Sequence, residues 1–168
     1  MNAAAARPAR WPCHPCPDPK KVNQVQDITE IGARLRAAVA LPDLLAASFD
    51  AFEIVRQVAR SSDHRAPELF AAFMMTANAA VDGREAVTIA PAMPAGGSSH
   101  ASVAAAGASI GEITAALTTL SALLADCLTR AATLTAEPGD QLACAQAAGA
   151  ARRIRDLMAD RGHDGHLR

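Results

Sequence analysis

Hydrophobic residues recur at alternating spacings of three and four through the second half of the chain. The series is Val103, Ala106, Ile110, Ile113, Leu117, Leu120, Leu124, Cys127, Ala131 and Leu134. Such a seven-residue repeat keeps its members on one face of an α-helix and favours packing against other helices at about 20°. The pattern therefore predicts one long helix from about Ser102 to Thr135.

The positions that flank this repeat indicate how the helix packs. A two-stranded coiled coil usually has Glu and Lys beside its apolar contact. Here the flanking residues are small or apolar, namely Gly107, Ser109, Thr114, Ala116, Ser121, Leu123 and Leu128. We therefore predict that the helix is buried over a broad face inside a bundle.

The composition favours the same fold class. Of the 168 residues, 51% are hydrophobic but only 3% are aromatic, and Tyr is absent. Most of the apolar content is Ala, which is the best helix former and is depleted in strands. We predict an all-α protein, an antiparallel bundle of four to five helices with the long helix at its centre.

Proline and apolar periodicity mark two further helices in the first half of the chain. One is predicted from about Asp27 to Ala40, with Asp27 and Glu30 at capping-box spacing. Its apolar stripe is Ile28, Ile31, Leu35 and Val39. Pro42 can open the next helix, which ends near Ser62. Its predicted inward residues are Leu45, Phe49, Phe52, Val55 and Ala59, and its predicted water-facing residues are Asp43, Asp50, Glu53, Gln57 and Arg60.

Two more helices complete the prediction. One begins at Pro67 and stops near Asp82, because Gly83 follows, and residues 84–90 add a short helical turn. The last runs from about Asp140 to Asp160 and is ended by Gly162. Its predicted apolar face is Leu142, Ala147, Ala150, Ile154, Leu157 and Met158.

The predicted helices define one domain with a tail at each end. Residues 1–24 contain five prolines and little to bury, so we predict a disordered tail. Residues 25–162 form a single helical-bundle domain, and residues 163–168 a frayed end. We expect a cytoplasmic protein, because the first residues lack the apolar segment of a signal peptide.

Charge and hydropathy argue against two classes of partner. The net charge is −1, with 16 basic and 17 acidic residues interspersed, so no strong field is available to attract nucleic acid. The longest apolar run, Ile113 to Ala125, is shorter than a membrane span by about seven residues. We expect neither a nucleic-acid partner nor a membrane span.

Few residues are arranged for chemistry. Cys13 and Cys16 form a C-H-P-C pair, a weak metal candidate, because a zinc site needs four ligands and no second such pair exists. Cys127 and Cys144 are expected in the core. His64 lies in a polar turn, where solvation or capping is the default. No Glu-x-x-His pair, H-E-x-x-H or phosphate-binding loop is present, and no cofactor is predicted.

Three arginines on the last predicted helix form a short basic cluster. They are Arg152, Arg153 and Arg155. Asp156 lies four residues after Arg152 and can pair with it, and Asp160 lies one turn further on. We interpret the cluster as a solvated face.

Aromatic and methionine residues gather on two consecutive predicted helices. They are Phe49, Phe52, Phe70, Phe73, Met74 and Met75. The favoured interpretation is the main core. The alternative is an apolar pocket or a subunit interface, with Phe49, Phe52, Phe70, Phe73 and Met74 as candidate ligand or interface residues.

Three hypotheses about function follow. The first is a non-catalytic interaction or regulatory protein that acts as a homo-oligomer or on a protein partner. The second is a bundle that binds a small apolar ligand between the Phe/Met helices. The third is an enzyme that uses His64 or the Cys13–Cys16 pair.

Overall fold

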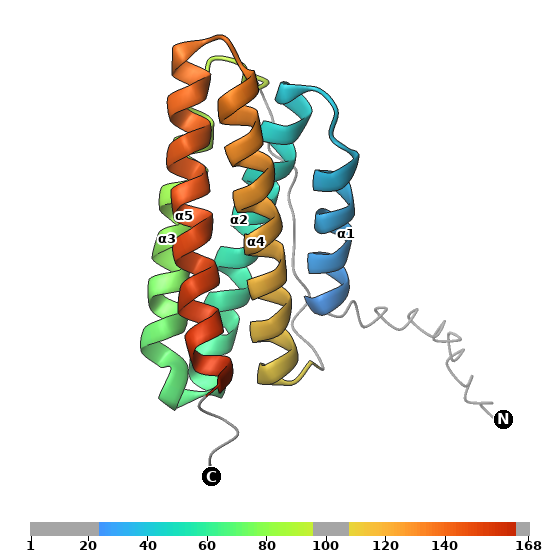
Figure 1. The fold of residues 1–168 in the computed structure, drawn as a ribbon. Helices are drawn as coiled ribbons and strands as arrows, with labels where there is room; N and C mark the ends of the chain where they lie inside the picture. Colours follow the sequence, from blue (N-terminus) through green and yellow to red (C-terminus); the bar gives the residue numbers. More distant parts are fainter. Residues whose placement is uncertain (1–23, 96–107, 164–168) are drawn as a thin grey trace, which may run out of the picture.

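The computed structural model describes residues 24–95 and 108–163, and within them the chain is all-helical (Figure 1). Five α-helices pack against each other. They are α1 (Gln24–Ala37), α2 (Leu41–Ser62), α3 (Phe70–Thr88), α4 (Ile110–Leu134) and α5 (Pro138–His163). Two short 3-10 helices, η1 (Asp63–Arg65) and η2 (Pro67–Leu69), join α2 to α3.

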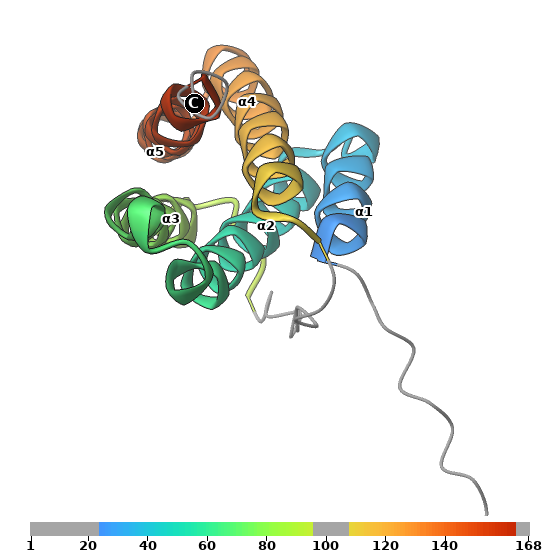
Figure 2. The same cartoon turned by 90° about the horizontal axis from the view of Figure 1, so that it is seen from below.

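The helices surround a common core. α4 packs on α5, α1 and α2, whereas α3 packs on α2 and α5. Seen along the helices, α1 and α3 lie on opposite sides of the fold (Figure 2). The largest fully buried side chains come from every helix: Ile31, Leu35, Leu45, Phe52, Phe73, Ile113, Leu117, Leu124, Leu128, Ile154 and Met158.

α4 carries the predicted broad buried face but starts later than predicted. Thr114, Ser121 and Leu128, which flank the repeat, are all buried. Ala108 and Ser109 are outside the helix. Ser109 is the N-cap, because its hydroxyl accepts the Glu112 N–H at 3.2 Å while the Glu112 carboxylate accepts the Ser109 N–H at 2.8 Å. Val103, Ala106 and Gly107 lie outside the described residues.

α3 does not stop at Gly83, contrary to the sequence prediction. It continues to Thr88, and the ring of Phe52 occupies the space beside Gly83. A Cβ added at Gly83 would lie 2.4 Å from Phe52 Cε1. The glycine therefore allows the Phe52 ring of α2 to pack directly against the backbone of α3. The start also differs, since Pro67 opens η2 and α3 begins at Phe70.

The ends of α1 and α5 also differ from the predictions. α1 begins at Gln24, so Asp27 lies in its first turn instead of capping it. It ends at Ala37, which leaves Val39 in the connection to α2 with 99% of its surface exposed. α5 begins at Pro138 and passes through Gly162 to His163.

Four predicted side-chain placements were wrong. Asp50 is buried at 1% exposure instead of facing water, and Glu53 and Gln57 are partly buried. The reason for Asp50 is an ion pair of 2.9 Å from Arg34 on α1 to its carboxylate. Leu142, predicted on the apolar face of α5, is 57% exposed.

Among the described helices, α4 has the length and composition to cross a membrane, a property that core helices of soluble proteins share. Its exposed residues include Glu112, Asp126 and Arg130, and charges of this kind are costly in hydrocarbon. The absence of a membrane span stays a prediction.

Candidate functional site

The predicted Phe and Met candidates are divided between the core and the surface. Phe52 and Phe73 are fully buried between α2 and α3. Phe49 is partly buried, and the Arg84 guanidinium lies 5.6 Å from the centre of its ring. Phe70 and Met74 are each 48% exposed. The five residues therefore do not line one pocket.

A small hollow of about 310 Å³ lies beside the exposed members of this set. Its lining combines apolar and polar side chains from α2, η1 and α3. The residues are Ala59, Arg60, Asp63, Phe70, Phe73, Met74, Ala77 and Asn78.

A charged network joins α2 to α3 next to the buried phenylalanines. Glu53 accepts hydrogen bonds from Arg56 and Gln57 on its own helix and from Arg84 on α3 at 2.7 Å. These bonds, the one from Arg56 above all, outweigh the effect of burial and hold the pKa of Glu53 at about 2 instead of 4.5. The carboxylate is thus saturated with donors, which suits a structural link better than a proton-transfer role.

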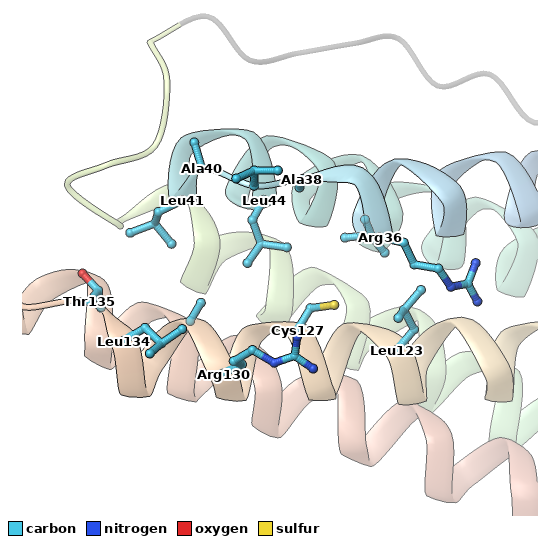
Figure 3. Close-up of a pocket in the computed structure, with 13 residues that line it drawn as sticks. Arg36, Ala38, Ala40, Leu41, Leu44, Leu123, Cys127, Arg130, Leu134 and Thr135 are labelled. Carbon is cyan, nitrogen blue, oxygen red and sulfur yellow. The ribbon is translucent and has the colours of Figure 1, made fainter.

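A larger hollow of about 530 Å³ lies between α1 and α4 (Figure 3). Apolar residues make up most of its walls. The lining consists of Leu35, Arg36, Ala38, Val39, Ala40, Leu41, Leu44, Leu123, Cys127, Arg130, Ala131, Leu134 and Thr135.

A second hollow of about 430 Å³ continues between the same two helices toward the start of each. It shares Arg36 and Leu123 with the first. Its other lining residues are Val25, Ile28, Thr29, Gly32, Glu112, Ala115, Ala116, Thr119 and Leu120. We call the two hollows together the α1–α4 groove.

Two arginines carry the positive charge of the α1–α4 groove. Arg36 comes from α1 and Arg130 from α4, and both are exposed. Neither guanidinium group forms an ion pair or a hydrogen bond with another described residue. Both side chains line the larger hollow together with Cys127 (Figure 3). The neighbouring Arg34 forms an ion pair with Asp50. Of these two arginines on α1, only Arg36 is therefore available to a ligand.

The cysteines of the described chain are not activated as nucleophiles. Burial raises the pKa of the Cys127 thiol and of the Cys144 thiol above 9.0. Cys144 is fully buried, as expected, whereas Cys127 is partly exposed at the groove. Both thiols are therefore mainly protonated near neutral pH.

The remaining predicted candidates show no catalytic arrangement. His64 lies in η1 and is exposed, with Nδ1 3.4 Å from the Asp63 carboxylate. Cys13 and Cys16 lie outside the described residues. Within residues that the structure describes, no three His, Cys, Asp or Glu side chains are close enough together to hold a metal ion.

The basic cluster on α5 pairs differently from the prediction. Arg153 contacts Asp82 on α3 at 2.9 Å, and Arg152 donates to the Thr129 hydroxyl on α4 at 2.7 Å. Arg155 pairs with Asp156 at 2.8 Å. Arg152 and Arg153 therefore link α5 to α4 and α3, whereas Arg155 pairs within α5.

Sequence reasoning missed the α1–α4 groove. Leu35, Val39, Cys127, Ala131 and Leu134 were recognised as members of apolar stripes, and the three on α4 were assigned to its buried face. Arg36 and Arg130 were not singled out. The sequence signal that could have indicated the groove is an arginine next to the end of each apolar stripe, Arg36 beside Leu35 and Arg130 beside Ala131.

No family model matches the chain, and neither a curated protein nor a solved structure matches it.

Proposed function

We propose that this chain is a non-catalytic interaction protein that acts through self-association or on a protein partner. Its binding surface is the α1–α4 groove, and the ligand is an amphipathic helix with acidic side chains. The observation that carries the proposal is the pairing of apolar walls with two guanidinium groups that have no described partner. An acidic side chain beside an apolar stripe would satisfy both features.

The shape of the groove favours a helix over a small molecule. The groove is lined from Val25 to Ala40 on one side and from Glu112 to Thr135 on the other. At about 1.5 Å per helical residue it extends for roughly 20 Å or more. Pockets for small molecules commonly bury 70–90% or more of the ligand surface. A long groove between two helices instead suits a third helix laid along it.

The arrangement of the helices belongs to the same proposal. We propose that the five helices form one antiparallel bundle with α4 as its central helix. The fully buried Leu117, Leu124 and Leu128 support this, because they fix α4 while its Leu123 side contributes to the groove. The groove then lies on a rigid scaffold. Binding has a lower entropic cost because the groove does not need to be ordered first.

Charge reversal in the groove tests the proposal. Arg36→Glu/Arg130→Glu should weaken self-association, or capture of a native partner, by at least tenfold, because two attractive contacts become repulsive. Arg152→Glu/Arg155→Glu is the matched control, with the same change in net charge on α5. Sedimentation equilibrium measures self-association, and affinity capture from the native host measures partner binding. If the groove variant behaves like wild type in both, this function is wrong.

A second candidate function is binding of a small apolar ligand between α2 and α3. The hollow of about 310 Å³ beside Phe70, Phe73 and Met74 favours it. Native mass spectrometry of the purified chain should then show a bound mass that Met74→Glu removes. The exposed Ile89→Glu serves as the control, and a ligand-free wild-type chain would exclude this candidate.

A further inference from the structure

Exposed hydrophobic side chains gather on two surfaces of the molecule. Seven large hydrophobic side chains are exposed in the described chain: Val39, Phe70, Met74, Met75, Ile89, Leu134 and Leu142. Val39 and Leu134 line the α1–α4 groove. Phe70, Met74 and Met75 lie together on α3. Because concentrated apolar exposure marks interaction surfaces, α3 presents a second such surface.

The outward side of α3 combines these apolar residues with acidic ones. Apart from Thr88 at its end, the exposed residues of α3 lie along one side of the helix, and we call this set the α3 face: Phe70, Ala71, Met74, Met75, Asn78, Asp82 and Glu85. The apolar members occupy the first half of the helix and the acidic members the second half. The Glu85 carboxylate has no hydrogen bond or ion pair with another described residue. Asp82 pairs with Arg153 at the surface, where both side chains are more than half exposed.

The single basic residue of α3 does not offset this acidity. Arg84 points away from the α3 face, since it donates to Glu53 at 2.7 Å and lies over the ring of Phe49. The α3 face is therefore apolar and acidic, whereas the α1–α4 groove is apolar and basic.

We propose that the α1–α4 groove of one copy receives the α3 face of a second copy of this chain. This inference rests on the function proposed above and names its partner. The complementary charges are Arg36 and Arg130 in the groove against Asp82 and Glu85 on the α3 face. The complementary apolar sets are the groove section lined by Ala116 and Leu120 and the exposed Phe70 and Met74 of the α3 face.

The order of residues along the two surfaces sets the direction of binding. The groove section near the start of α4 is lined by Ile28, Ala116 and Leu120, and its arginines lie toward the end of α4. On α3 the apolar residues come first and the acidic ones later. The incoming α3 therefore runs in the same direction as α4. Its 19 residues extend about 28 Å, which suits the length of the groove.

Other segments of the chain fit the groove less well. Residues 1–24 contain four basic residues and one acidic residue, so their charge has the same sign as the groove. The exposed side of α5 includes Arg152 and Arg153 and meets the same objection. Among the described helices, α3 is the one that offers exposed aromatic or methionine side chains together with exposed carboxylates.

The two surfaces produce head-to-tail assembly. α3 and α1 lie on opposite sides of the fold (Figure 2), so a copy bound through its α3 face still has a free groove. A contact between two different surfaces yields a closed ring or an open filament, not a symmetric dimer.

Paired charge reversals test this arrangement. Wild-type protein should show a mass that rises with concentration in sedimentation equilibrium. Arg36→Glu/Arg130→Glu and Asp82→Lys/Glu85→Lys should each associate at least tenfold more weakly. An equimolar mixture of the two variants should recover assembly, because the acidic α3 face of one meets the basic groove of the other, and the reversed surfaces also match. Arg152→Glu/Arg155→Glu should assemble like wild type.

Neutral variants test the head-to-tail geometry separately. Arg36→Ala/Arg130→Ala weakens the groove, and Asp82→Ala/Glu85→Ala weakens the α3 face. Their mixture retains one intact pair of surfaces, so it should form a one-to-one dimer that grows no further. Larger assemblies in this mixture would contradict the head-to-tail contact.

The outcomes separate this inference from the proposed function. A wild-type chain that stays monomeric at millimolar concentration, or charge-reversed variants that do not recover assembly when mixed, overturns the inference. If capture of another protein still depends on Arg36 and Arg130, the proposed function stands without it. If neither self-association nor capture depends on these arginines, both are wrong.

Discussion

Gly83 lies inside α3, and the ring of Phe52 fills the space beside its Cα. Sequence reasoning treated this glycine as a helix stop, since glycine is a poor helix former. Its actual role depends on a residue about thirty positions earlier in the chain. Helix propensity alone therefore predicted, wrongly, that Gly83 would end the helix.

We predict that Gly83→Ala destabilises the fold by about 1–3 kcal/mol, because the new methyl group forces the Phe52 ring to move. Gly149→Ala in α5 is the matched control, since no described heavy atom outside the helix's own backbone lies within 4 Å of its added Cβ. That control should stabilise by about 0.5–1 kcal/mol through helix propensity. Urea unfolding followed by circular dichroism measures both. Equal effects of the two substitutions would contradict the packing role of Gly83.

Asp50 shows a second way in which single residues depart from a sequence pattern. It was predicted to face water because it repeats with Asp43 and Gln57 along α2. However, α2 contacts α1, α3 and α4, so its solvent-facing stripe is narrower than the pattern suggests. The Asp50 side chain is 2% exposed and is balanced by Arg34, which is half exposed.

We expect Arg34→Met to destabilise the protein by about 3 kcal/mol, because it leaves a buried carboxylate without its counter-charge. Arg60→Met on the surface of α2 should change stability by less than about 0.5 kcal/mol. Adding Asp50→Asn to Arg34→Met should recover part of the loss, since the buried group is then neutral. Chemical unfolding of the three variants measures these free energies. If the Arg34 variant is as stable as the Arg60 variant, the ion pair to Asp50 does not stabilise the fold.

The helices themselves were more predictable than their ends. Apolar spacing predicted four to five helices, one of them long, and the described residues contain five with α4 among the longest, because periodic burial is encoded locally. The ends depend on contacts that the spacing does not contain. Ser109 starts α4 through a reciprocal cap with Glu112, and Gly162 remains inside α5.

The Glu53 network that joins α2 to α3 should make the free energy of unfolding depend on pH in the acidic range. Glu53 has a pKa of about 2 in the folded protein, below its ordinary 4.5. The unfolded chain therefore takes up this proton more readily than the folded chain. The stabilisation is complete above about pH 4.5 and is lost as the pH falls toward 2. It amounts to roughly 3 kcal/mol at most.

We predict that Glu53→Gln lowers the free energy of unfolding at pH 7 by about 1–3 kcal/mol. The difference from wild type should shrink steadily between pH 4.5 and pH 2, because wild type loses its charged link there. Glu85→Gln, which removes an exposed carboxylate on α3, is the control. Unfolding curves across this pH range provide the measurement. A difference that stays constant with pH would show that Glu53 does not act through its charge.

At the scale of the whole molecule, the candidate site arises from a difference in helix length. α1 has 14 residues and α4 has 25, so α1 covers only part of the α4 surface. The exposed end of α4 includes Leu134, the last member of the repeat that predicted this helix. The sequence predicted the apolar stripe of α4 but not which part of it α1 buries. That depends on which helix packs beside α4 and on where that helix ends.

Cys127 lines the groove together with Arg36 and Arg130 and can report on its occupancy. In a Cys13→Ser/Cys16→Ser chain, we expect a maleimide to modify Cys127 first and Cys144 only after unfolding, since Cys144 is fully buried. Burial raises the pKa of the Cys127 thiol above 9.0, so its labelling rate should still be increasing at pH 9.

The concentration dependence of this rate connects the thiol to assembly. If a second copy occupies the groove, labelling of Cys127 should slow several-fold as the protein concentration rises through the association range, and dilution should restore it. In the same background, Arg36→Glu/Arg130→Glu should label at a rate independent of protein concentration. Comparing each variant with itself at two concentrations cancels the direct effect of the arginines on the thiol. Concentration-independent labelling in an otherwise wild-type chain that does associate would place the contact elsewhere, because a helix in the groove must cover Cys127.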